Sequence, residues 1–110
     1  MALVNFYPGT TKAFSVAISH NGATPDITAD SVTFYLKRAP SDPDSAALIV
    51  ATGDVATAGA SGTALFTLTP ATTAIEPRRY HYDIVWRLVS GAEYVLERGT
   101  IAVVARVSDV

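Results

Sequence analysis

The sequence predicts an all-β fold, an antiparallel β-sandwich, and three features of the chain support that fold class. Short segments in which apolar and polar residues alternate recur along the 110 residues, separated by turn-forming Gly, Pro, Asn and Asp. About seven such segments follow one another at spacings of roughly 8–12 residues, which is the pattern of immunoglobulin-like sandwiches. No window of about 12 or more residues carries the 3.6-residue period of a helix. We therefore expect a single immunoglobulin-like β-sandwich domain over residues 1–110.

Turn chemistry sets the ends of the predicted strands. Asn21-Gly22 supplies the positive φ angles of a tight turn after the first strand. The Pro- and Asp-rich residues 39–45 form a loop, in which Asp44 or Ser45 can cap one helical turn. Gly99 lies where a β-bulge could redirect the chain between the last two strands. The predicted strands cover residues 13–18, 32–37, 48–51, 64–68, 80–88, 94–97 and 101–107.

The stretch from Thr69 to Leu88 is the most informative part of the chain. Thr69 can cap a short helical turn that has Pro70 at its first position, and Pro77 ends that turn. In the strand that follows, alternate positions from Tyr80 to Leu88 are aromatic or aliphatic and are expected to face the core. Tyr80 is also placed to form a tyrosine corner, whose hydroxyl bonds to the chain just upstream; plain core packing is the alternative.

The composition argues against several classes of partner. The net charge is −2 and the charges are scattered, so the basic stripe of a nucleic-acid-binding protein is missing. There is no polybasic cluster and no apolar run of about 20 residues, so no membrane is expected to bind this chain. The N-terminal residues do not predict a signal peptide. Only 16% of the residues are charged, below the usual ~25%, which favours a surface partly covered by a partner.

Residues that could hold a metal are few. The chain has no cysteine, which excludes disulfides and thiolate ligands. His81 and Asp83 share a strand face, but metal sites need three or four ligands and no third candidate has a useful spacing. Asp42 and Asp44 resemble the start of a calcium loop that lacks its glycine and its late glutamate, and turn formation explains both residues. We expect neither a metal nor another cofactor.

The sequence also lacks the motifs of an enzyme. It has no Gly-x-Ser-x-Gly elbow, no phosphate-binding glycine loop and no recognisable nucleophile and base pair. Trp86 and the tyrosines could stack against sugars in a carbohydrate-binding module. The position of Trp86 on the same strand face as Ile84 and Leu88 favours the core for that ring instead.

Two segments are candidates for binding a partner protein. The apolar residues 3–7 are cut off from the first strand by Pro8-Gly9, so residues 1–11 could be a docking arm that adds to a neighbour's sheet edge. The alternative is a strand that pairs within its own domain. Two adjacent arginines after Pro77 suit carboxylates of a partner, and a solvated loop is the alternative. The predicted contact residues are Leu3, Val4, Phe6, Tyr7, Arg78 and Arg79.

The order of these strand and turn motifs resembles a known group of proteins. The segments that carry the resemblance are residues 11–16, 21–22, 26–28, 32–37, 41–49, 69–70, 77, 80–84 and 99–103. They are similar to small immunoglobulin-like proteins from the structural gene clusters of tailed phages and prophages, and to the N-terminal domain of the upper baseplate protein family. This chain departs from that pattern at Arg78-Arg79, where such proteins tend to have glycine after the proline.

The resemblance implies a non-enzymatic structural protein of a tailed-phage virion, made in the cytoplasm of the host bacterium. It would be an accessory, decoration or adaptor module, present as a homo-oligomer or in several copies, that binds other virion proteins on the capsid or on the tail and baseplate. A carbohydrate- or receptor-binding module of the tail is the alternative. Neither capsid nor tail is favoured, because both uses need a stable sandwich with one adhesive face.

Overall fold

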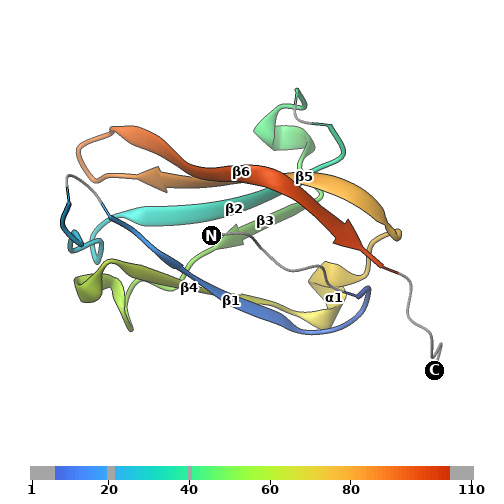
Figure 1. Cartoon of the computed structure of the whole chain (residues 1–110), viewed down its shortest axis with the longest axis horizontal. Coiled ribbons are helices and arrows are strands. Elements are labelled where there is room, and N and C mark those ends of the chain that lie inside the picture. The colour runs from blue at the N-terminus through green and yellow to red at the C-terminus, as the bar shows by residue number, and fades with distance from the viewer. Residues whose placement is uncertain (1–6, 20–21, 40, 105–110) are drawn as a thin grey trace.

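The computed structural model describes residues 7–19, 22–39 and 41–104, which form two antiparallel sheets packed face to face (Figure 1). The smaller sheet pairs β1 with β4, and the larger has the strand order β3-β2-β5-β6. This division is the immunoglobulin-like one, in which strands B and E share one sheet and strands C, F and G share the other. The strands are β1 (Lys12–Ala17), β2 (Ser31–Lys37), β3 (Ile49–Thr52), β4 (Thr63–Leu68), β5 (Arg78–Arg87) and β6 (Glu93–Val103).

The predicted all-β sandwich is confirmed, and the strand count differs for one reason. Within the described ranges there are six strands rather than about seven, because the two segments predicted at 94–97 and 101–107 are joined in the single strand β6. The helical pieces are short and lie in the connections between strands: η1 (Asp44–Ala46), η2 (Gly59–Ser61) and α1 (Pro70–Thr73). Figure 1 shows α1 at the opposite end of the sandwich from the β5–β6 hairpin.

The core lies between the two sheets and is centred on aromatic rings. Phe14 of β1 stacks on Phe66 of β4 with ring centroids 4.9 Å apart, and it meets Phe34 of β2 edge-on at 5.4 Å. The aromatic row predicted on β5 is confirmed, since Tyr80, Tyr82, Ile84 and Trp86 are all buried. The remaining buried members of the core are Val16, Ile18, Ile27, Val32, Leu36, Ile49, Ala64, Leu68, Ile101 and Val103.

The sequence predicted a bulge at Gly99, but the bulge in the large sheet lies at Leu96. Ile84 pairs with Glu97 and Val85 pairs with Val95, so Leu96 is the extra residue. The bulge changes the parity of the strand, which brings Tyr94 onto the core side with its ring centroid 5.4 Å from that of Trp86. Gly99 has a different role: a Cβ there would lie 3.0 Å from the Tyr82 hydroxyl, so the missing side chain makes room for that ring.

The turn before β5 begins as predicted, but its helix α1 ends at Thr73 and does not extend to Pro77. Thr69 caps α1 by accepting a hydrogen bond from the Thr72 amide, and Pro70 stands in the first turn. The Tyr80 hydroxyl donates to the Glu76 carbonyl at 2.5 Å, which confirms the tyrosine corner. Burial, reinforced by the charge of Glu76, raises the pKa of the Tyr80 hydroxyl, so it stays protonated as a donor.

The core predicts a large cost for truncating its central ring. Phe34→Ala should lower the free energy of unfolding by about 3–5 kcal/mol, because it removes a fully buried ring between the sheets. The matched control is Val89→Ala, at a side chain that is 80% exposed, which should change stability by less than about 0.5 kcal/mol. Urea denaturation followed by far-UV circular dichroism measures both. Equal stability of the two variants would contradict this packing.

The tyrosine corner predicts a smaller and more specific effect. Tyr80→Phe keeps the ring and removes the bond to Glu76, so it should cost about 1 kcal/mol. Tyr35→Phe is the control, because the Tyr35 hydroxyl makes no hydrogen bond within the described part of the chain. Thermal unfolding of the two variants compares them directly, and an unchanged Tyr80→Phe protein would show that the corner does not stabilise the domain.

Candidate functional site

The strand alternation that fills the core also sends a row of polar side chains to the outer face of the large sheet. On β5 this row contains Arg79, His81, Asp83 and Arg87, with the buried Val85 among them. The strand register then sets their neighbours. His81 lies between Lys37 of β2 and Thr100 of β6, and Asp83 lies between Tyr35 and Arg98.

A cavity of about 200 Å³ opens on this face, toward the α1 end of β5. The side chains around it come from three adjacent strands, so the sheet register and not a loop fixes their positions. We call this cavity the basic pocket. Its lining residues are Lys37, His81, Tyr82, Asp83, Arg98 and Gly99.

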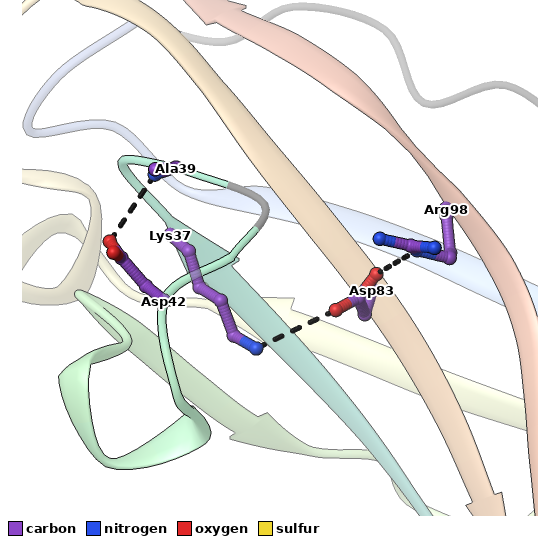
Figure 2. A network of polar contacts seen from close by, with 5 residues as sticks. All are labelled: Lys37, Ala39, Asp42, Asp83 and Arg98. Carbon is purple, nitrogen blue, oxygen red and sulfur yellow. Dashed lines mark hydrogen bonds and ion pairs between the residues drawn. The ribbon is translucent and has the colours of Figure 1, made fainter.

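Asp83 holds the two cations of the basic pocket in place. Its Oδ2 lies 3.6 Å from Lys37 Nζ, and its Oδ1 accepts a hydrogen bond of 3.0 Å from Arg98 Nε. Figure 2 shows Lys37 and Arg98 reaching this carboxylate from opposite sides. The Lys37 side chain is only 7% exposed and that of Asp83 is 21% exposed, whereas Arg98 is 63% exposed. The pocket thus has a buried ion pair at its base and a guanidinium at its rim.

Lys37 owes its burial partly to the neighbouring aromatic ring. Its ammonium lies 5.7 Å from the centre of the Tyr35 ring, and the Arg87 guanidinium lies at the same distance from that ring. Thr33, Tyr35 and Val85 are buried on this outer face, so the middle strand β2 is covered on both sides. The sheet behind the pocket is therefore closely packed.

Positive groups outnumber negative ones around the pocket. Among the residues that line the pocket, Lys37 and Arg98 are cationic and Asp83 is the one carboxylate. Arg79 lies farther along the same face of β5, and the whole chain has a net charge of −2. The His81 imidazole and the Arg79 guanidinium make no hydrogen bond or ion pair with the described residues. These groups, and the Arg98 guanidinium beyond its Nε, can donate hydrogen bonds to an anion.

The predicted partner-binding residues divide between described and undescribed positions. Leu3, Val4 and Phe6 lie outside the described residues, so the docking arm stays a prediction. Tyr7 is exposed at the start of a turn in which the Thr10 hydroxyl donates to its carbonyl at 2.7 Å.

The end of the proposed arm is tied to the sandwich. The carbonyl of Thr10 accepts a hydrogen bond of 2.5 Å from the buried Thr73 hydroxyl of α1. Residues 7–10 therefore connect the N-terminal segment to the core at a fixed point.

Arg78 and Arg79 are exposed, but they are the first residues of β5 and not part of a loop. They pair with Val103 and Ala102 of β6. The Arg78 guanidinium lies 5.6 Å from the centre of the Tyr80 ring, and Arg79 shares the outer face with His81. The sequence pointed to these arginines and missed Lys37 and Arg98, because those two are brought to the site only by strand register.

The geometry gives less support to sugar stacking by Trp86 and to a metal site. Trp86 is 3% exposed and its indole N–H donates to Asp30 at 3.0 Å, so its ring is not available to stack on a sugar. The Asp42 carboxylate accepts from the Ala39 amide and caps its own turn. Among the described residues, no group of three or more His, Cys, Asp or Glu side chains could hold a metal ion.

A second cavity, of about 250 Å³, lies between the edge strands of the two sheets, β1 and β6. It is lined by Val16, Ala17, Ile18, Ser19, Leu96 and Glu97. Glu97 there accepts a 2.6 Å hydrogen bond from the Tyr82 hydroxyl. This cavity is mostly aliphatic and has less polar chemistry than the basic pocket.

No family model, no curated protein and no solved structure matches the chain. In the part of the chain that the structure describes, no helix is long and apolar enough to span a membrane.

Because the ion pair of Asp83 is more buried than that of Glu93, neutralising Asp83 should cost more stability than neutralising Glu93. Asp83→Asn should lower the free energy of unfolding by about 1–3 kcal/mol, because it removes a countercharge from the buried Lys37. Glu93→Gln is the matched control: its contact with Arg87 is more exposed and should be worth less than about 1 kcal/mol. Adding Lys37→Met to Asp83→Asn should recover part of the loss. Chemical denaturation measures all three, and an Asp83→Asn protein as stable as the control would contradict the account.

Proposed function

We propose that this protein is a non-enzymatic structural component of a tailed-phage virion, where it joins other virion proteins as an accessory, decoration or adaptor module. The observation that carries the proposal is where the sandwich puts its polar groups. Arg79, His81 and Arg98 lie together on the outer face of the large sheet, and most of the large aromatic rings are in the core. A preformed charged face of this kind suits contact with another protein surface.

The resemblance of the strand and turn pattern to small phage structural proteins supplies the virion setting of this proposal. The chemistry of the pocket agrees with a non-catalytic role. Asp83 is engaged by Lys37 and Arg98, so it is poorly placed to act as a general base or a nucleophile. A module present in many copies can bind through a small face, because many weak contacts add up in an assembled particle.

The burial of Trp86 takes one ring away from a carbohydrate-binding module, whereas Tyr7 and Tyr94 are exposed. Aromatic rings that stack on sugars must be exposed, whereas the Trp86 ring is buried on the core side of β5 beside the Tyr94 ring. The structural role, with capsid and tail as its two locations, is the function we propose, and a carbohydrate- or receptor-binding module of the tail is the alternative.

The proposal predicts that the protein rejoins particles that lack it. The gene would be deleted from the phage genome that carries it, and the purified protein added to the resulting particles. We expect the protein to cosediment with them at a fixed, saturable stoichiometry. Phage particles of an unrelated type are the control for nonspecific adsorption. Failure to cosediment, together with wild-type particles that contain none of the protein, would overturn the virion role.

A further inference from the structure

We propose that the basic pocket binds carboxylate groups carried on an extended acidic segment of a partner protein. This inference rests on the proposed docking role and names the chemistry of the partner. The site comprises Lys37, His81, Asp83 and Arg98, with Arg79 beside it on the same strand face.

The charges around the pocket favour an anion. Outside the pocket, Glu93 pairs with Arg87 toward the other end of the face, and the Asp42 carboxylate accepts from the Ala39 amide (Figure 2). Asp83 is the one carboxylate among the lining residues and contacts both Lys37 and Arg98, so the described lining side chains carry a net positive charge. A carboxylate is the ligand that guanidinium and ammonium groups bind with charge-assisted hydrogen bonds.

The site is also preorganised for this ligand. Asp83 fixes Arg98 through Nε, so the terminal amino groups of this exposed guanidinium are left to bind an incoming oxygen. Lys37 is held at the base by the same carboxylate and by the Tyr35 ring. A ligand therefore meets cations whose side-chain entropy is already reduced by the sheet.

The size and spacing of the site point to a protein segment. A cavity of about 200 Å³ is smaller than the sites that enclose a metabolite, and it suits the end of one side chain. Arg79 lies two residues from His81 on the same face, a separation of roughly 6–7 Å along a strand. Two carboxylates at alternate positions of an extended segment have the same spacing, so one can enter the pocket while the next meets Arg79.

The net charge of the chain favours such a segment over a nucleic acid. A long phosphate backbone would extend beyond the pocket, where its charges would meet the surface of a protein whose net charge is −2. Nucleic-acid affinity needs several phosphates neutralised at once by a basic stripe. A short acidic segment needs only the few donors of the pocket and Arg79 beside it.

The test is an NMR titration of the full chain with a synthetic peptide, Gly-Glu-Ser-Glu-Gly with blocked ends. We expect saturable shifts centred on His81 and Arg98, and binding that weakens as salt is raised. The double variant Arg79→Gln/Arg98→Gln should bind roughly tenfold more weakly, whereas Arg87→Gln, on the same face but paired with Glu93, should bind as the wild type does.

A matched peptide with glutamine in place of glutamate should produce no saturable shift. Equal binding of the two peptides, an equal effect of Arg87→Gln, or no binding at all would overturn the inference. Inorganic phosphate is the second probe. If phosphate binds more tightly than the peptide, the inference of a carboxylate ligand is overturned and the pocket is a phosphate site. Cosedimentation with the deleted particles is independent of this titration, so a protein that joins the particle without binding the peptide retains its proposed function and loses this site.

Discussion

The rest of the structure depends on the alternation of side chains along β5. Tyr80, Tyr82, Ile84 and Trp86 enter the core between the sheets, and the residues between them must then face outward. A slip of one residue would exchange the two sets, placing aromatic rings in solvent and His81 and Asp83 in the core. The tyrosine corner and the bonds that Asp30 accepts from Trp86 and Val89 hold the two ends of the strand. The core therefore fixes the register, and the register assembles the basic pocket.

The ion pair in that pocket contributes more to position than to net stability. Removing Lys37 and Asp83 from water costs free energy that their mutual attraction largely offsets. What the pair provides is geometry, because one carboxylate sets both the buried ammonium and the exposed Arg98 guanidinium. The surrounding sheet supports this arrangement: Thr33, Tyr35 and Val85 are buried on the outer face and leave β2 covered on both sides.

Local patterns in the sequence predicted the fold well and the site only in part. The alternation from Tyr80 onward, the Thr69-Pro70 cap and the tyrosine corner are local signals, and each was confirmed. The position of the bulge could not be predicted, because it depends on Tyr94 meeting Trp86 across two strands. The site could be predicted only in part for the same reason. Arg79 stands out in the sequence, whereas Lys37 and Arg98 lie 42 and 19 positions away from it. These two residues reach Asp83 only because β2 and β6 pair with β5.

We propose that the outer face of β5 is the surface by which this protein binds other virion proteins. A cryo-electron microscopy reconstruction of the virion, at a resolution that shows side chains, tests it most directly. The account predicts density of a neighbouring protein over the basic pocket, with an acidic side chain within hydrogen-bond distance of Arg98 or His81. A reconstruction in which that face is open to solvent, and the protein is attached through another surface, would contradict it.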